Sequence, residues 1–489
     1  MKKNVSILML LGCSMSLFAQ SQKQPNVIFI LADDIGYGDF SCYGGDQKVK
    51  TPALDALAHQ GARFTNAYAP AATSSPSRYA LLTGEYAFRK HVSILSADAP
   101  LCIAKSTYTL PQMFKEAGYR TGIVGKWHLG LGTKGQVVDF NKSILDGPLR
   151  VGFDYAYYFP ATNDRVPTIF IENDKVVGLE ADDPITISYK KKVGNLPTGK
   201  ENPSLLRMTY IRGHKGTIVN GVSRIGWMSG GKNTVWRDED MTAGSYQKAI
   251  NFIEKQSNKP FFLYYAPHNA HEPRIPSEAF RGHSQAGIYG DLIEEFDYYI
   301  GCLVKELKQQ NLFENTIIIV SSDNGPMIKE GYNDGALENI NGHDPFNGLR
   351  GEKYSLHEGG VRVPFIVSWP AQIKKPFIQD QPFCYADMLS TYAGLLNFPL
   401  TKAQRKDSKN GAALFLNQNV PNYRKYVIVQ NNTGEIAVRA GKWKYIPVQK
   451  GVQSSLYNLA IDPAEMHDMQ FSFEQKRKEF EAWWKKQNK

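Results

Sequence analysis

The chain has 489 residues, of which 42% are hydrophobic and 12% aromatic, enough for a large core in two or three domains. Charged residues make up 21% without a long run of one sign, which excludes an intrinsically disordered protein. The formal net charge of +10 suits an anionic substrate, although a generally basic surface explains it equally well. No compact basic and aromatic motif indicates a nucleic-acid partner.

Residues 1–20 have the features of a signal peptide. Lys2 and Lys3 precede the apolar run VSILMLLGCSMSLFA, and the polar QSQKQ follows it. We therefore expect export to the periplasm, and the Leu-Leu-Gly-Cys sequence leaves open a lipoprotein anchored through Cys13. No later stretch reaches the roughly 18 apolar residues of a membrane span, so none is predicted. The other four cysteines lack Cys-x-x-Cys spacing, which excludes a zinc ribbon and leaves disulfides open.

Strand and helix patterns alternate through residues 24–400, which we assign to one large domain. Apolar runs predict buried strands, and proline-started or amphipathic patterns predict helices, in the order strand 26–34, helix 51–64, helix and strand 109–128, helix 292–310, strand 315–325 and strand 361–370. This alternation is typical of an α/β fold with a large, mostly parallel sheet and helices on both faces.

Two segments depart from that pattern. Residues 135–240 are rich in Gly, Asn and Asp, and we interpret them as an irregular insertion near the site. Residues 401–489 are predicted to form a small α+β subdomain, with antiparallel strands in 426–448 and a helix over 472–487.

Acidic and amide side chains follow two of the predicted strands. Asp33 and Asp34 end the first strand, and Asp323 and Asn324 end a later one. In an open α/β sheet, ligands collect at the carboxyl ends of the strands. Oxygen ligands without Cys or His favour calcium or magnesium over zinc. Each pair taken alone is more often a helix cap or a turn, and their joint placement favours the metal site.

Basic residues also lie beside predicted strand ends. They are Lys126 and His128 after one strand, His268 and His271 in APHNAHEP, and Lys353 in RGEKYSLHEGG. Together these groups can surround an anion and supply an acid and a base. The alternative, equally supported by spacing alone, is that they are solvated or packed residues.

A serine begins the stretch SSPSRYALLTG at residues 74–84. Ser74 lies at a predicted helix start, where a serine before a proline is an ordinary cap. As a nucleophile it needs a base, a metal or chemical modification to activate it.

Ser74, Pro76 and Arg78 with the following YALLTG resemble the signature of type I sulfatases in their serine form. The resemblance extends over nearly the whole chain after the signal. It includes PNVIFILADDIGYGD, TPALDALAHQGARFTNAY, GYRTGIVGKWHLG, SSDNG, RGEKYSLHEGGVRVPFI and, near the end, GKWKYI and LYNLAIDPAE. It implies an alkaline-phosphatase-like fold and makes residues 24–400 a catalytic sulfatase domain.

The resemblance also implies roles for individual residues. Ser74 would be oxidised to Cα-formylglycine by a maturase before export, and its hydrated aldehyde would attack the sulfate ester. A calcium ion would be held by Asp33, Asp34, Asp323, Asn324 and the modified Ser74. The implied catalytic groups are Arg78 holding the formylglycine, Lys126 and Lys353 binding sulfate oxygens, His271 as the leaving-group acid with His268 as the alternative, and His128 as the base.

The sequence indicates the reaction more closely than it indicates the substrate. We expect exo-acting hydrolysis of sulfated glycans such as glycosaminoglycans or mucins, with sulfated galactose or N-acetylgalactosamine favoured. Asp164, Arg165 and His214 are candidate sugar contacts, and an equally supported alternative is that they are structural loop residues. Two other functions stay open: a phosphate or phosphonate ester hydrolase of the same superfamily, and a non-catalytic binder of sulfated glycans.

Overall fold

The computed structural model describes residues 24–255, 257–421, 423–448 and 452–487. The predicted signal segment 1–20 and Cys13 lie outside these ranges. No helix within them combines the length and apolarity needed to cross a lipid bilayer. The four cysteines within them are unpaired, so no disulfide joins the parts of the fold described here.

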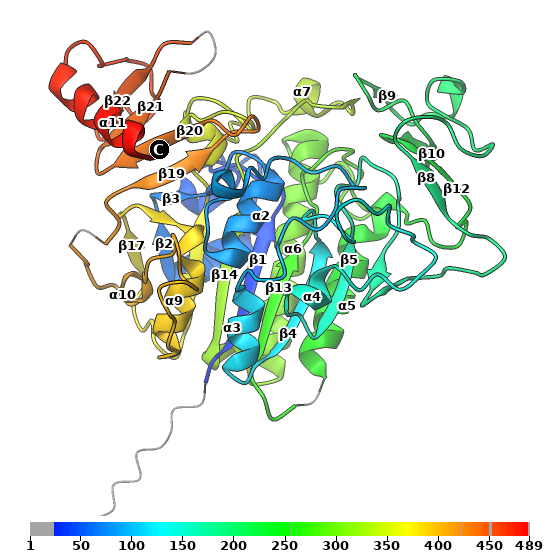
Figure 1. Cartoon of the computed structure of the whole chain (residues 1–489), viewed down its shortest axis with the longest axis horizontal. Helices are drawn as coiled ribbons and strands as arrows, with labels where there is room; N and C mark the ends of the chain where they lie inside the picture. The colour runs from blue at the N-terminus through cyan, green and yellow to red at the C-terminus, as the bar shows by residue number, and fades with distance from the viewer. Residues whose placement is uncertain (1–23, 256, 422, 449–451, 488–489) are drawn as a thin grey trace, which may run out of the picture.

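A ten-stranded sheet forms the centre of the molecule (Figure 1). Its five middle strands are parallel, and the strand that flanks them on each side runs antiparallel to them. In spatial order the strands are β17 (Phe377–Gln379), β2 (Ala62–Phe64), β16 (Phe365–Ser368), β14 (Thr316–Ser322), β1 (Asn26–Ala32), β13 (Phe261–Ala266), β4 (Arg120–Lys126), β5 (Tyr155–Phe159), β6 (Ile171–Glu172) and β7 (Lys175–Val176).

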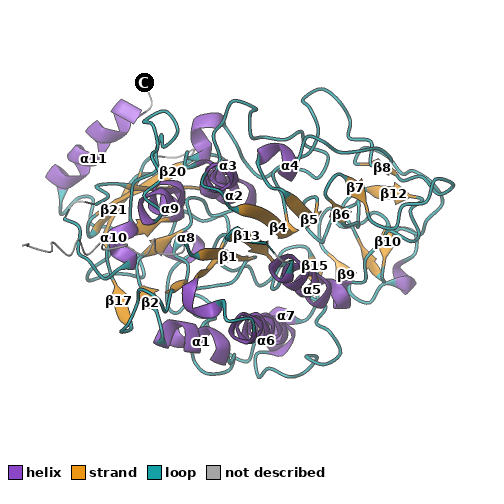
Figure 2. Cartoon of the chain, turned by 90° about the horizontal axis from the view of Figure 1, so that it is seen from below, coloured by secondary structure: helices purple, strands orange, loops and turns teal. Residues whose placement is uncertain are grey.

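Helices cover both faces of this sheet (Figure 2). Alternate residues of β1 belong to two separate apolar cores, with Val27 and Phe29 in one and Ile28 and Ile30 in the other. One core contains α2 (Ser74–Thr83), α3 (Leu110–Glu116) and α9 (Met388–Leu395), and the other contains α1 (Pro52–His59), α5 (Met241–Glu254) and α6 (Gly287–Gln309). The predicted α/β fold with a mostly parallel central sheet is confirmed.

Local sequence explains where these helices begin. Pro52 occupies the first turn of α1, where a missing N–H costs nothing. In α3 the Thr109 side chain accepts from Gln112 N, and the Gln112 side chain accepts from Thr109 N. This reciprocal capping box satisfies two backbone donors that the helix itself leaves free.

Two features differ from the sequence-based expectation. The strand predicted at 361–370 is the shorter β16, and it runs antiparallel to β14. The stretch 135–240 contributes β5 to the parallel centre of the main sheet, paired with β4, and is largely irregular before β5 and in its later part. That later part forms small two-stranded sheets from β8 (Thr186–Ser188) and β12 (Trp227–Ser229) and from β10 (Ile218–Val219) and β11 (Val222–Ser223).

The C-terminal part is a four-stranded antiparallel sheet, as expected from 426–448. It comprises β19 (Val427–Gln430), β20 (Ile436–Ala440), β21 (Trp443–Ile446) and β22 (Ser455–Asn458), followed by α11 (Glu474–Gln487). Its apolar side shares a core with Ala72 and Ala80, which flank and belong to α2. The parallel strands end at one edge of the main sheet. Figure 1 shows the C-terminal sheet on one side of this edge and the small sheets that contain β8, β10 and β12 on the other side.

Candidate active site

The predicted site residues collect at the carboxyl edge of the parallel strands. Ala32, the last residue of β1, is in register with Ser322, the last of β14, so Asp33 lies beside Asp323. Gly125 in β4 is in register with Ala266 in β13, which brings Lys126 and the loop carrying His268 and His271 to the same edge. These side chains are all buried.

Lys126 connects the first acid to the serine. Its ammonium donates to both carboxylate oxygens of Asp33, at 2.7 and 2.8 Å, and to Ser74 Oγ at 3.0 Å. Such a charged donor beside a hydroxyl stabilises negative charge that develops on that oxygen.

Arg78 and Lys353 pair with the other two acids. Arg78 donates to Asp323 Oδ2 through Nε at 3.1 Å and Nη2 at 2.8 Å, and to the Tyr264 hydroxyl at 3.2 Å. Burial alone would raise the pKa of Asp323, but Arg78 and Lys126 lower that pKa to about 2, so the group is a carboxylate. Lys353 Nζ donates to Asp34 Oδ2 at 2.8 Å.

The acid cluster can accommodate a hard cation. Ligand atoms of Asp33, Asp34 and His271 all lie within 4.8 Å of one another. The Asn324 amide donates to Asp34 Oδ1 at 2.7 Å, while its own Oδ1 is buried with no hydrogen-bond partner among the described residues. A buried carbonyl oxygen without a donor is costly unless it has a ligand, and a cation supplies one.

Ser74 is not the helix cap. The cap position of α2 belongs to Thr73, which makes no capping bond with its side chain, and Ser74 begins the first turn. Its hydroxyl accepts from Lys126 within the acid cluster. Arg78, one turn further along the same helix, donates to Asp323 of the same cluster. The helix therefore presents two of the signature residues to one point.

His271 and His268 differ in their surroundings. His271 Nε2 is 3.9 Å from Asp34 Oδ2, and its Nδ1 lies 3.1 Å from Asn163 Oδ1 and 2.6 Å from the Glu272 carbonyl. His268 packs against the Phe159 ring, and burial lowers the pKa of its imidazole to about 4. His268 is therefore neutral near pH 7, whereas His271 has its free nitrogen at the acids.

His128 follows β4 and is buried on the other side of Lys126. Its Nε2 lies 2.9 Å from the Leu95 carbonyl, so this nitrogen carries the proton, and Nδ1 has no partner among the described residues. Burial, followed by the Lys126 charge, lowers the pKa of His128 well below its usual value. The ring is a neutral imidazole with a free lone pair, which is the state of a proton acceptor.

Asp164, Arg165 and His214 form a connected group beside these residues. His214 Nε2 lies 3.0 Å from Asp164 Oδ2, and Arg165 Nε lies 3.5 Å from Asp164 Oδ1. Burial opposes the charge of His214, but its hydrogen bond to Asp164 raises the pKa of the imidazole above its usual value. The neighbouring Asn163 holds His271, which places this group next to the acid cluster.

The sequence analysis missed Glu330, Asn163 and Tyr264. Glu330 Oε2 accepts from Lys353 Nζ at 2.9 Å, and Tyr264 and Asn163 hold Arg78 and His271. Asn163 precedes the Asp-Arg pair already noted, and Tyr264 lies inside an apolar strand. Glu330 lies in the loop after β14 but well beyond the end of that strand, so no spacing pointed to it.

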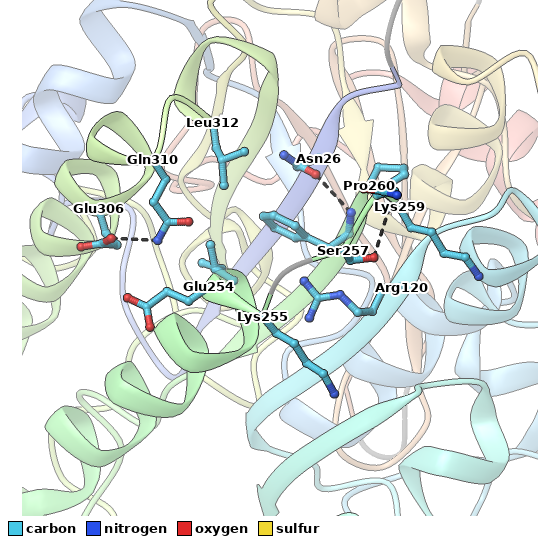
Figure 3. Close-up of a pocket in the computed structure, with 13 residues that line it drawn as sticks. Asn26, Arg120, Glu254, Lys255, Ser257, Lys259, Pro260, Glu306, Gln310 and Leu312 are labelled. Atoms are coloured by element: carbon cyan, nitrogen blue, oxygen red, sulfur yellow. Dashed lines mark hydrogen bonds between the residues drawn. The ribbon is translucent and has the colours of Figure 1, made fainter.

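A separate cavity of about 690 Å³ lies at the opposite end of the sheet (Figure 3). Asn26, Arg120 and Phe261, which begin β1, β4 and β13, contribute to its wall. Charged side chains surround it, including Lys255 and Lys259. Because ligands of open α/β sheets bind at the carboxyl ends of the strands, the cluster around Ser74 is the better candidate site.

Comparison with known proteins gives the family of the chain. The family model for sulfatases matches residues 25–398, which is more than half of the chain. The chain belongs to the sulfatase family. This sulfatase is 44% identical to an N-acetylgalactosamine-6-O-sulfatase of Bacteroides thetaiotaomicron, over 95% of this chain and 93% of that protein. The human N-acetylgalactosamine-6-sulfatase is 31% identical over 76% of this chain and 62% of that protein.

Solved structures give the same result for the fold. One solved structure belongs to a study of the metabolism of multiple glycosaminoglycans by Bacteroides thetaiotaomicron. It superposes on this chain with a TM-score of 0.91 at 44% identity, and the match covers 95% of this chain and 99% of that chain. A phosphonate monoester hydrolase of Agrobacterium radiobacter has a TM-score of 0.59 at 17% identity, covering 94% and 95%, and shows the shared fold alone. The sulfatase is therefore a sulfuric ester hydrolase with an alkaline-phosphatase-like fold.

Proposed function

We propose that this sulfatase removes a 6-O-sulfate from N-acetylgalactosamine or galactose at the end of a sulfated glycan, with glycosaminoglycans favoured. The observation that carries the proposal is the 44% identity to an N-acetylgalactosamine-6-O-sulfatase over almost the full length of both chains. The human relative with 31% identity has the same specificity in its name. The family match and the 44% identical relative favour sulfate-ester hydrolysis over the phosphate or phosphonate ester hydrolase and the non-catalytic binder that the sequence left open.

Asp164, Arg165 and His214 are proposed to recognise the sugar ring. They are joined to one another and to Asn163, which holds His271, so a sugar hydroxyl bound there is fixed relative to the leaving oxygen. A carboxylate that accepts from a sugar hydroxyl discriminates strongly, because an epimer leaves a buried polar group unpaired.

Ser74 is proposed to be the precursor of formylglycine, formed by a maturase before export to the periplasm. When hydrated, this group supplies two hydroxyls on one carbon, one to attack sulfur and one to release sulfate. An unmodified serine would keep the sulfate as a stable ester. The 3.0 Å contact of Ser74 Oγ with Lys126 supports this assignment, because the ammonium stabilises the deprotonated nucleophile.

The other residues bind the sulfate and move protons. Lys126 and Lys353 are proposed to donate to sulfate oxygens, which is supported by their contacts with Ser74 and Asp34, and Arg78 is proposed to hold the residue at position 74 by way of Asp323. His271 Nε2 is proposed to give a proton to the leaving sugar oxygen, since Nδ1 donates to Asn163 or Glu272. His128 Nδ1 is proposed to take a proton in the sulfate-release step.

Calcium is the proposed cation, held by Asp33, Asp34, Asp323, Asn324 and the modified Ser74, and when bound it would polarise the sulfate ester. The unpartnered Asn324 Oδ1 supports it. If so, adding calcium to chelator-treated protein should raise the melting temperature, because the ion binds only the folded state. Asn324→Ala should lose most of this increase. An equal increase in wild-type and variant proteins would contradict the site.

The substrate proposal is tested with protein from a host whose maturase accepts serine. Wild type and Ser74→Ala are assayed on N-acetylgalactosamine, galactose and N-acetylglucosamine 6-sulfates and on N-acetylgalactosamine 4-sulfate, with mass spectrometry of the residue-74 peptide. We expect a loss of two hydrogens at Ser74, no activity in the variant, and a preference of about 100-fold or more for the first two sugars. High activity with Ser74 wholly unmodified would refute the formylglycine mechanism, and a preference for another sulfate would refute the substrate.

A further inference from the structure

Glu330 lies on the far side of Lys353 from the acid cluster. Lys353 Nζ is 2.8 Å from Asp34 Oδ2 and 2.9 Å from Glu330 Oε2, and its side chain is buried. The ammonium thus lies between two carboxylates from different loops: Asp34 follows β1 and Glu330 follows β14. Burial opposes a charge on Glu330, but Lys353, followed by His271 and the Tyr354 hydroxyl, lowers its pKa to about 2, so Glu330 is an anion.

Glu330 has a second contact, with the hydroxyl of Tyr354, which donates to Oε1. Tyr354 has a φ of +77°, a left-handed backbone conformation that is strained for a residue with a side chain. Its backbone N–H donates to the Ala72 carbonyl at 2.8 Å, two residues before Ser74. A single carboxylate therefore holds both the lysine and the strained residue that contacts the nucleophile loop.

The two partners of Lys353 are not equivalent. Asp34 belongs to the proposed cation site, and a carboxylate that shares its charge with a dication attracts a neighbouring ammonium less strongly. Glu330 shares no contact with that site among the described residues, so its full charge stays available to Lys353. Without Glu330, the lysine would have its weakened partner alone and would tend to move away from the cation.

We propose that Glu330 is a positioning residue of this sulfatase: it keeps the Lys353 ammonium directed at the substrate's sulfate group and fixes the Lys353–Tyr354 turn against the loop that leads into Ser74. The inference rests on the proposed function in two respects, the cation beside Asp34 and the binding of sulfate oxygens by Lys353. Glu330 itself does not touch the reacting atoms.

A double-mutant cycle tests this role. Glu330→Ala, Lys353→Ala and the double variant are compared with wild type for kcat, KM and inhibition by free sulfate. Partners of a site residue typically contribute about 10–100-fold, so we expect a loss in kcat/KM of this size for Glu330→Ala, with weaker sulfate inhibition. In the Lys353→Ala background the same change should cost less than about twofold, because residues acting through one contact are not additive.

Further variants separate positioning from folding. Glu330→Gln is nearly isosteric and keeps an acceptor, so it should fold and recover part of the activity. Tyr354→Phe removes the other contact and should have a smaller effect on sulfate inhibition. Glu338→Gln, at an exposed glutamate whose carboxylate is 3.4 Å from Lys329, is the matched control and should behave as wild type. Melting temperatures are measured for each protein.

The outcomes are distinct. Losses for Glu330→Ala that are equal in both backgrounds, or unchanged sulfate inhibition in Glu330→Ala and Glu330→Gln, would overturn the positioning role. If Glu330→Ala is fully active while Lys353→Ala is inactive, this inference fails and the proposed role of Lys353 stands. If both are fully active, the sulfate-binding role of Lys353 fails as well.

Discussion

The state of His271 is set by its hydrogen bonds. Nδ1 faces two acceptors, Asn163 Oδ1 and the Glu272 carbonyl, so this nitrogen carries a proton in either charge state. Asn163 is oriented in turn, because its amide nitrogen donates to the Pro273 carbonyl at 3.2 Å. Nε2 is left facing the acid cluster, 3.9 Å from Asp34 Oδ2. Under the proposed function, Nε2 is therefore the nitrogen that would give its proton to the leaving oxygen.

This arrangement predicts a dependence on the leaving group. A sugar alkoxide needs a proton to leave, whereas a nitrophenolate does not. His271→Ala should lower kcat/KM by about 100-fold or more on a sugar sulfate and by less than about tenfold on nitrophenyl sulfate. His268→Ala is the control and should affect both substrates alike. Equal losses from His271→Ala on both substrates would argue against the acid role, and a selective loss in His268→Ala would transfer the role to that residue.

At the scale of elements, the strands were easier to predict than their arrangement. The apolar runs that became β1 and β14 are buried on both faces, so composition alone marks them, and their polar ends followed directly. The direction of a strand has no comparable signal in the sequence, so the antiparallel orientation of β16 was not predicted. β5 was missed within 135–240 because its YAYYF sequence is short and the surrounding loops dominate the composition.

The loop between β1 and α1 is held by a buried histidine. His343 lies between two carboxylates, with Nε2 2.8 Å from Asp39 and Nδ1 2.9 Å from Asp46. The Tyr289 hydroxyl donates to the same Asp39 at 2.6 Å. Burial opposes a charge on His343, but the two carboxylates raise its pKa to about 9. The same loop contains Asp34, so the contacts of His343 with Asp39 and Asp46 help to hold the acid cluster in place.

A raised folded-state pKa gives stability that is complete below the unfolded value, near 6.5, and is lost as pH rises through about 9. A shift of this size corresponds to about 3 kcal/mol. His343→Gln should therefore lower the free energy of unfolding by up to about 3 kcal/mol at pH 6, and the difference from wild type should shrink by pH 10. Urea unfolding across this range measures it, with the exposed His59→Gln as control. A difference that is constant with pH would contradict the assignment.

At the scale of the molecule, the C-terminal sheet is part of the active-site support. Ala72 N donates to the Gln430 carbonyl at 2.7 Å, and Gln430 N donates to the Pro70 carbonyl at 3.1 Å. The segment leading to Ser74 is therefore hydrogen-bonded to β19, and it shares an apolar core with the C-terminal strands. A change that loosens this sheet should act on catalysis as well as on folding.

A buried ion cluster also joins the C-terminal sheet to the main domain. Lys444 of β21 donates to Glu358, in α8 (Glu358–Val361), at 2.9 Å, and lies 3.0 Å from Glu465. All three side chains are buried, and Glu358 also accepts from the Tyr68 hydroxyl at 2.7 Å. Removing the lysine would leave two carboxylates in the interior without their shared cation. Glu358 belongs to the main domain and Glu465 follows the last strand of the C-terminal sheet. Loss of the lysine should therefore weaken the packing of the C-terminal sheet on the main domain.

We therefore expect Lys444→Met to lower the free energy of unfolding by about 3–5 kcal/mol, the range for breaking a buried ion pair by removing one partner. Thermal unfolding followed by far-UV circular dichroism should show one transition at a lower temperature, and sulfatase activity should be lost within it. Lys442→Met, at an exposed lysine two residues earlier, is the matched control and should melt like wild type. A separate early transition that leaves activity intact would mean that the C-terminal sheet unfolds on its own, and the proposed support of the Ser74 loop would then be wrong.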